Sequence, residues 1–269
     1  MSDLSSCQSS QPLLRAPVIV IGMGHSGTTL VSEMLHKAST PMYSGDHEPG
    51  YDDGIRYERP LCQQINTQIL GLPKKPKILE QLWKLPQHSI SEENRQKLHA
   101  EVGRGAWGFK DPRTTITYEK WTQAFPDCTT IYVYRRHEEV LRSFFRNRTS
   151  RISSLRRMRW GMVAWVHYNR ALLRHMDSDA KAGRRHVLVK YEELMEHPGL
   201  LGQIESAVGI ELFDARNPKL RRNRVQNAGE IRLYRLAAIG FGSDIPALYR
   251  ELDARRLQPQ AEAESHNST

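Results

Sequence analysis

A glycine-rich turn near the start of the chain has the residue types and spacing of an anion-binding loop. The apolar run Val18–Ile21 predicts a buried strand, and the turn at residues 22–27 follows it directly. Apolar residues at helical spacing then predict a helix over residues 28–38. Backbone N–H groups of such a turn and of the first helical turn point at one place, where the helix dipole favours negative charge. The pattern therefore predicts a site for a phosphate-like group.

The residues after the turn argue against a nucleoside triphosphate and magnesium. The spacing from Gly22 to Gly27 matches G-x-x-x-x-G, which in nucleotide-binding loops continues with a phosphate-binding Lys and a Mg²⁺-binding Ser or Thr. Here Thr28 and Thr29 stand at those two positions, and the strand predicted over residues 129–134 ends in arginine rather than aspartate. A kinase is therefore the alternative, and an anion held without a metal is the preferred interpretation.

Strand patterns and helix patterns alternate along the chain. Strands are predicted over Val18–Ile21 and over residues 107–110, 129–134 and 187–190. Helices are predicted over residues 28–38, 54–70, 91–103, 138–146, 160–169 and 191–195. Alternation of this kind predicts an α/β fold, with a central parallel sheet flanked by helices. We expect a flexible N-terminus over residues 1–16, one P-loop-like domain over residues 17–252 and a polar C-terminal tail over residues 253–269.

Composition excludes several classes of protein. The chain has 269 residues, of which 39% are hydrophobic and 26% charged, as expected of a globular protein. It has no apolar stretch of about 18 residues for a membrane helix, and its polar N-terminus does not resemble a signal peptide. Three scattered cysteines are too few for a disulfide framework or a zinc site. We expect a reducing, cytoplasmic setting without membrane association.

A surplus of positive charge favours an anionic ligand or partner. The formal net charge is +9, and residues 135–159 contain nine arginines. Such a segment with Phe144 and Phe145 could suit single-stranded nucleic acid, or it could be a solvated helical face. The two phenylalanines fall within a helix that should pack on the sheet, and no nucleic-acid-binding motif accompanies them. Nucleic-acid binding is therefore a second alternative, and we expect no nucleic-acid partner.

Four segments resemble the sulfotransferases that use 3′-phosphoadenosine 5′-phosphosulfate (PAPS). Residues 24–30, GHSGTTL, resemble the loop that binds the 5′-phosphosulfate. Residues 131–143 resemble the 3′-phosphate signature, in which Arg135 ends a strand and Ser143 follows eight positions later. Residues 108–113 and 187–194 resemble further family segments in the expected order. The resemblance covers about residues 18–200 and implies an enzyme that transfers a sulfuryl group from PAPS to a hydroxyl group.

The resemblance assigns the donor to two anion-binding sites. It implies that the 5′ end is bound by the loop residues Gly24, His25, Ser26, Gly27, Thr28 and Thr29. It places Arg135 and Ser143 on the 3′-phosphate and Tyr191 near the adenine, although a core tyrosine fits that position equally well. By the same resemblance, Arg222 belongs to a basic loop over the 3′-phosphate. No metal is implied.

The catalytic residues depart from the usual family pattern. The loop has His25 where the family normally has Lys or Arg, so Lys110 becomes the leading candidate for the fixed positive charge. Many cytosolic members have a catalytic histidine where this chain has Pro112, whereas carbohydrate-acting and bacterial relatives use a glutamate some twenty residues after the loop. We therefore predict Glu48 as the general base, with His47 or Asp46 as alternatives.

An acidic run near the predicted base bears on the acceptor. Five acidic residues lie between positions 46 and 58, namely Asp46, Glu48, Asp52, Asp53 and Glu58. Beside an anion site, such residues would attract a cationic acceptor and repel an anionic one. We predict a small hydroxylated natural product that carries an amine or guanidinium group, such as a guanidinium alkaloid. Asp46, Asp52 and Asp53 are the predicted acceptor-binding residues, although an ordinary acidic loop remains the alternative.

Overall fold

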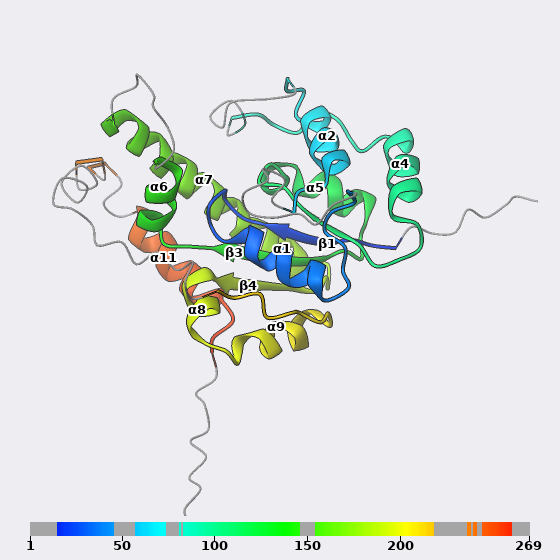
Figure 1. Cartoon of the computed structure of the whole chain (residues 1–269). Helices are drawn as coiled ribbons and strands as arrows, with labels where there is room; N and C mark the ends of the chain where they lie inside the picture. Colours follow the sequence, from blue (N-terminus) through cyan, green and yellow to red (C-terminus); the bar gives the residue numbers. More distant parts are fainter. Residues whose placement is uncertain are drawn as a thin grey trace, which may run out of the picture.

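A parallel four-stranded sheet forms the centre of the protein (Figure 1). The computed structural model describes residues 15–45, 57–73, 81, 83–145, 154–217, 236–237, 239–240 and 244–259. The strands are β1 (Val18–Ile21), β2 (Gly108–Lys110), β3 (Thr129–Tyr134) and β4 (His186–Lys190). They lie in the order β2-β1-β3-β4, and each neighbouring pair is parallel. The predicted α/β class is therefore confirmed.

Helices separate the strands along the chain. In order they are α1 (Thr28–Lys37), α2 (Pro60–Ile69), α4 (Glu92–Val102), α5 (Thr114–Ala124), α6 (His137–Phe145), α7 (Ser154–Lys181), α8 (Tyr191–Glu196), α9 (Leu200–Val208) and α11 (Asp244–Arg255). The helix predicted over residues 54–70 is wrong at its start, because residues 57–59 are not helical. Proline suits the first position of a helix, where no N–H donor is needed and its fixed φ is already helical. The helix therefore begins at Pro60.

Alternate side chains of the strands enter two hydrophobic cores. Val18 and Val20 of β1 belong to the core shared with α1, α8 and α9. Ile19 and Ile21 belong to the core shared with α2, α4, α5, α7 and α11. Figure 1 shows α1 in front of the strands, α8 and α9 below β4, and α5 above β1. All four side chains of β1 are buried, as expected for a parallel strand covered on both faces.

The strand order determines where a ligand can meet the sheet. β1 pairs with β2 on one side and with β3 on the other, and the chain then continues from β3 to β4. The connection after β1 therefore leads to one side of the β1–β3 pair, and the connection after β3 leads to the other side. Ligands of open α/β sheets bind outside the carboxyl ends of the strands at such a switch point. The turn after β1 and Arg135 after β3 both lie there.

Helix α11 is attached to the carboxyl ends of β3 and β4. Asp253 accepts hydrogen bonds from the Tyr134 hydroxyl at 2.5 Å and from Lys190 Nζ at 2.9 Å. We expect the domain to end at Leu252, but α11 continues to Arg255. Asp253, which makes the contacts to β3 and β4, lies beyond the predicted end. The domain boundaries themselves stay a prediction.

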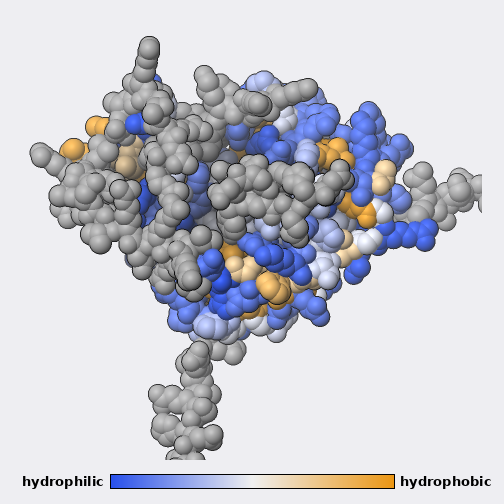
Figure 2. Space-filling view, viewed as in Figure 1, coloured by the Kyte–Doolittle hydropathy of each residue, from blue (hydrophilic) through white to orange (hydrophobic). Residues whose placement is uncertain are grey.

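On the face that Figure 2 shows, the described residues are mostly hydrophilic. Figure 2 shows hydrophobic residues in small separate groups among hydrophilic ones on the face in view. The large hydrophobic side chains that are exposed are Trp83, Leu85, Leu155, Phe213, Leu236 and Ile239. Within the part of the chain that the structure describes, no helix combines the length and the apolar character needed to cross a membrane.

Burial of His137 predicts that the fold is sensitive to acid. The imidazole packs against Trp165 and Tyr249, and burial lowers its pKa to about 4. An unfolded chain binds this proton at a pKa of about 6.5, so the free energy of unfolding should fall as the pH decreases from about 6.5 to about 4. His137→Gln should remove up to about 3 kcal/mol of that fall, measured by urea unfolding at a series of pH values.

The exposed His88 provides a matched control. His88→Gln should keep the pH dependence of the original protein, because this side chain is exposed and does not belong to the hydrophobic core. An unchanged pH dependence in His137→Gln would mean that His137 is not the source of the acid sensitivity.

Candidate active site

Two glycines and a histidine shape the turn between β1 and α1. A Cβ at Gly22 would lie 2.3 Å from the carbonyl oxygen of Val133, so the approach of the turn to β3 excludes any side chain there. Gly27 has a φ of +96°, and the ring of Tyr191 fills the space beside it. His25 is also left-handed, with a φ of 71°. Turns with such conformations direct backbone N–H groups toward one concave spot.

Ser26 lies within this turn and its side chain is fully buried. Its hydroxyl has no hydrogen-bond partner within the described ranges. A buried polar group left unpaired costs about 1–3 kcal/mol, so a ligand that pairs with this hydroxyl would be favoured. Thr28 and Thr29 form the start of α1, where the first N–H groups have no acceptor within the helix. The turn and the helix start therefore offer hydrogen-bond donors to an anion.

Arg135 follows β3 and is held close to the turn. Its guanidinium lies over the ring of Tyr191, 4.5 Å from the ring centroid. The carboxylates of Glu139 and Glu192 are 3.5 Å and 4.0 Å away, and the Arg135 carbonyl accepts a hydrogen bond from Trp165 at 3.0 Å. Arg135 Nε is buried and has no hydrogen-bond partner among the residues that are described. These contacts therefore fix the guanidinium beside the turn, and the Glu192 carboxylate lies 4.0 Å from Nε.

His25 connects the turn to α6. Its Nδ1 lies 3.0 Å from Ser143 Oγ, and its carbonyl accepts a hydrogen bond from Arg135 Nη1 at 3.4 Å. Ser143 is one of the residues of α6, the helix that follows β3. The two predicted anion sites therefore adjoin at His25.

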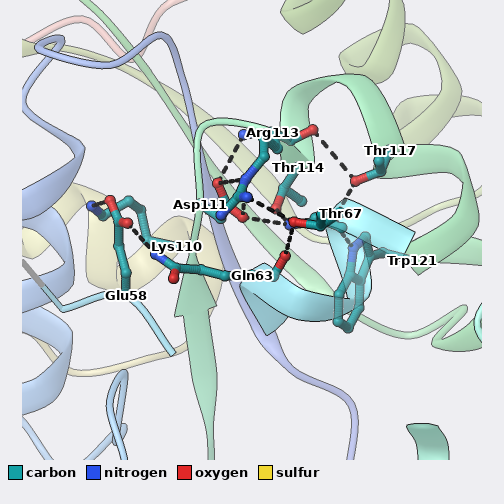
Figure 3. Close-up of polar contacts among 10 residues, drawn as sticks. Glu58, Gln63, Thr67, Lys110, Asp111, Arg113, Thr114, Thr117 and Trp121 are labelled. Atoms are coloured by element: carbon teal, nitrogen blue, oxygen red, sulfur yellow. Dashed lines mark hydrogen bonds and ion pairs between the residues drawn. The ribbon is translucent and has the colours of Figure 1, made fainter. Parts of the chain in front are cut away.

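Lys110 and Glu58 form an ion pair at the end of β2. Lys110 Nζ lies 2.5 Å from Glu58 Oε1, and only 3% of the lysine side chain is exposed. Gln63 of α2 donates a hydrogen bond to the other oxygen of Glu58. Figure 3 shows Glu58 and Lys110 directed toward each other, and Lys110 is in register with Val20 near the end of β1. A cation and a carboxylate thus lie together beside the glycine turn.

Asn66 fixes α2 against β2 and α5. Its amide nitrogen donates to Asp111 Oδ2 at 3.0 Å and to Thr114 Oγ1 at 2.8 Å. Its amide oxygen accepts from Thr117 Oγ1 at 2.6 Å and from Trp121 Nε1 at 2.8 Å. Asp111 directly follows the lysine of the ion pair, and Figure 3 shows this network beside that pair. The network therefore holds the helix that supports the glutamate against the strand that carries the lysine.

The predicted site residues fall into two groups. Those brought to the carboxyl ends of the strands are Gly24, His25, Ser26, Gly27, Thr28, Thr29, Lys110, Arg135, Ser143 and Tyr191. Those outside the described residues, whose roles stay predictions, are Asp46, His47, Glu48, Asp52, Asp53 and Arg222. Across the described ranges, no group of three or more His, Cys, Asp or Glu residues could hold a metal ion.

The sequence pattern did not single out Glu58 or Gln63. Glu58 belongs to an acidic run in the sequence, and nothing local connects it with Lys110. Pro60 was the available signal, because a proline that begins a helix places the preceding residues at that helix end. One turn into the helix, Gln63 then comes within reach of the same carboxylate.

The parallel sheet, the glycine turn at its switch point and the strand-end arginine define an α/β protein of the P-loop-like class. The chain belongs to the sulfotransferase family, because the model of that family, described as "Sulfotransferase family", matches residues 17–214. This match confirms the resemblance and supports sulfuryl transfer as the general activity.

Solved sulfotransferases have a similar fold. STF9 from Mycobacterium avium is 17% identical with a TM-score of 0.53, over 93% of this chain and 79% of that one. STF1 from Mycobacterium tuberculosis H37Rv is 14% identical with a TM-score of 0.51, over 90% and 77%. A sulfotransferase from Alicyclobacillus acidocaldarius is 14% identical with a TM-score of 0.51, over 91% and 98%. At these identities the likeness concerns the fold. No curated protein matches the chain in sequence.

Loss of the hydroxyl should affect the stability of the protein differently at two buried serines, Ser26 and Ser32. Ser26→Ala removes an unpaired group, so the free energy of unfolding without ligand should stay unchanged or rise by up to about 1 kcal/mol. Ser32→Ala, the matched control, removes a hydrogen bond of 2.9 Å to the Thr28 carbonyl and should lower it by about 1 kcal/mol. Urea unfolding measures both variants, and a larger loss in Ser26→Ala than in Ser32→Ala would contradict this account.

Proposed function

We propose that the protein transfers a sulfuryl group from PAPS to a hydroxyl group of a small molecule. The observation that carries the proposal is the buried, unpaired Ser26 hydroxyl in a glycine turn that adjoins Arg135. PAPS carries a 5′-phosphosulfate and a 3′-phosphate, so it needs two neighbouring groups of hydrogen-bond donors. Membership of the sulfotransferase family supports the same reaction.

The residues at the switch point fit the two ends of this donor. Ser26, Thr28 and Thr29 would hold the 5′-phosphosulfate through hydroxyl and backbone donors. Arg135 and Ser143 would hold the 3′-phosphate, because the guanidinium of Arg135 bonds the carbonyl of His25 in the turn and Ser143 Oγ lies 3.0 Å from the His25 ring. The ring of Tyr191, which supports Arg135, would lie near the adenine, and Arg222 stays a prediction for a closing loop.

Bound PAPS would supply an activated sulfuryl group, and the side chains beside the turn would neutralise charge. Transfer from one oxygen to another leaves negative charge on the departing oxygen, which a nearby cation stabilises. Lys110, which is paired with Glu58 at the end of β2, would be that cation. His25 would add a hydrogen bond from the turn itself.

Glu58 would act as the general base. The reaction requires a group that accepts the proton of the acceptor hydroxyl, and carboxylates perform this role. Glu58 lies 2.5 Å from Lys110, so the proton acceptor and the stabilising cation are adjacent. Gln63 orients the carboxylate from its other oxygen. The bases predicted from the sequence lie outside the described residues and stay predictions: Asp46, His47 and Glu48.

The acceptor class rests on charge. The acidic run at residues 46–58 predicts a cationic hydroxylated acceptor. Of its five acidic residues, Glu58 is the one that the structure describes. Asp46, Asp52 and Asp53 lie outside the described residues, so their part in acceptor binding stays a prediction. A phosphotransferase is the alternative reaction, and it would require nucleotide binding that depends on Mg²⁺.

Titration calorimetry with adenosine 3′,5′-bisphosphate, the spent donor, tests the proposal. Binding should occur without Mg²⁺, and ATP should give no signal. Arg135→Ala should weaken binding about ten- to a hundred-fold, because a hydrogen bond to a charged group contributes about 1.5–3 kcal/mol.

The neighbouring arginine is the matched control. The side chain of Arg136 is 57% exposed, and Arg136→Ala should change the affinity less than about two-fold, as expected for an exposed charge. ATP binding that requires Mg²⁺ would overturn the proposal in favour of a phosphotransferase. Equal losses in both variants would remove Arg135 from the 3′-phosphate site.

Replacement of the proposed base should separate catalysis from donor binding. Glu58→Gln should lower kcat by about 10²- to 10⁴-fold, the usual contribution of a general base, and leave the affinity for the bisphosphate unchanged. The assay uses PAPS with tyramine, a cationic phenol, and 2-naphthol, a neutral one. Glu33→Gln, which alters an ion pair with Lys37 within α1, is the control. An unchanged kcat in Glu58→Gln would return the role of base to Glu48, His47 or Asp46.

A further inference from the structure

The carboxylate of Glu101 joins two segments that are separate in the sequence. Its Oε1 accepts hydrogen bonds from Ser44 Oγ and from Arg59 Nη1, each at 2.5 Å. Ser44 precedes and Arg59 follows residues 46–56. Glu101 belongs to the last turn of α4, where the helix dipole disfavours a negative charge. Its stabilisation at this position therefore comes from the groups that it binds, and the strongest of these is Arg59.

Arg59 is a buried cation that contacts three other parts of the chain. Only 1% of the residue is exposed. Its Nη2 donates to the Pro41 carbonyl at 2.9 Å, and its Nε donates to the Gly108 carbonyl at 3.3 Å. Its guanidinium also lies 5.8 Å from the ring centroid of Trp107. With the bond to Glu101, each of the three guanidinium nitrogens donates a hydrogen bond, which restrains the Arg59 side chain and the backbone that carries it.

These contacts reach both members of the catalytic ion pair. Glu58 directly precedes Arg59, so the backbone of the glutamate is fixed by the anchored arginine. Gly108 begins β2 and Lys110 ends it, and residues two apart in a strand belong to the same face. Arg59 therefore sets the distance between the segment that carries Glu58 and the strand that carries Lys110.

We propose that Glu101 is a positioning residue, which holds Arg59 so that the carboxylate of Glu58 meets the ammonium group of Lys110. The proposal rests on the proposed function, because it takes Glu58 as the base. A buried ion pair contributes little net stability compared with apolar packing, and its effect is on geometry. Geometry matters at this place because a displacement of about 1 Å in a catalytic group can cost about a hundred-fold in rate.

Glu101→Gln tests the proposal while keeping the shape of the side chain and an oxygen acceptor. With PAPS and tyramine, kcat should fall between about ten- and a hundred-fold, whereas the affinity for adenosine 3′,5′-bisphosphate stays within about two-fold. Glu101→Asp keeps the charge and should recover part of kcat. Glu93→Gln is the matched control, since Glu93 lies on the same helix in an exposed ion pair with Lys97, and it should leave kcat unchanged.

A double variant distinguishes positioning from a general structural effect. If Glu101 acts through Glu58, adding Glu101→Gln to Glu58→Gln should lower kcat no further, because the group being positioned is already lost. Losses that multiply in the double variant would overturn the proposal. So would an unchanged kcat in Glu101→Gln, or a loss of kcat that Glu101→Asp does not recover.

A measurement without donor or acceptor separates this proposal from the proposed function. The rate at which N-hydroxysuccinimidyl acetate acetylates Lys110, measured by mass spectrometry, reports how often the ion pair with Glu58 opens and exposes the lysine. Labelling should be several-fold faster in Glu101→Gln than in Glu93→Gln, and equal labelling would overturn the positioning role. If labelling rises as expected but the original protein transfers no sulfuryl group from PAPS, the proposed function fails and the positioning contact stands.

Discussion

The close approach of the glycine turn to β3 is the constraint on which the rest of the site depends. At Gly22 the carbonyl oxygen of Val133 occupies the place where any side chain would begin, and at Gly27 the ring of Tyr191 does so. Because no side chain intervenes, the turn lies directly against β3, the strand that Arg135 follows. The same tyrosine supports the guanidinium of Arg135. One backbone contact therefore brings together segments from β1, β3 and the start of α8.

Ion pairs organise the other side of the site, at the end of β2. Three pairs lie there, formed by Lys110 with Glu58, by Arg59 with Glu101 and by Arg113 with Asp111. Burying these charges costs solvation free energy, which is offset only when hydrogen bonds are complete and well oriented. The amide nitrogen of Asn66 supplies one of these hydrogen bonds, to the carboxylate of Asp111. The glycine turn thus offers donors for an anion, while the end of β2 presents a paired cation and carboxylate.

Much of the fold follows from local patterns in the sequence. β1 and β3 have the predicted bounds, since continuous apolar runs are typical of parallel strands covered on both faces. The helix predicted over residues 91–103 is confirmed as α4, whose caps are Ser91 and Gly103. The sequence pattern places the start of α2 too early, because residues 55–59 contain no helix breaker before Pro60. The sequence pattern predicts no specific helix for α5, α9 or α11. Their stability comes from tertiary packing, which for α9 is against β3 and β4 and for α5 and α11 is chiefly against α7.

The sequence by itself determined the glycine turn, the arginine at the end of β3 and the lysine at the end of β2, because each depends on residues adjacent in the chain. Only the tertiary structure decided which distant side chains meet. Glu58 and Lys110 are 52 positions apart, and His25 and Ser143 are 118 apart. Local sequence carries no signal for such pairs, since they form only when the strand order places the ends of β2, β1 and β3 side by side. The identity of the carboxylate beside the lysine was therefore a property of the fold.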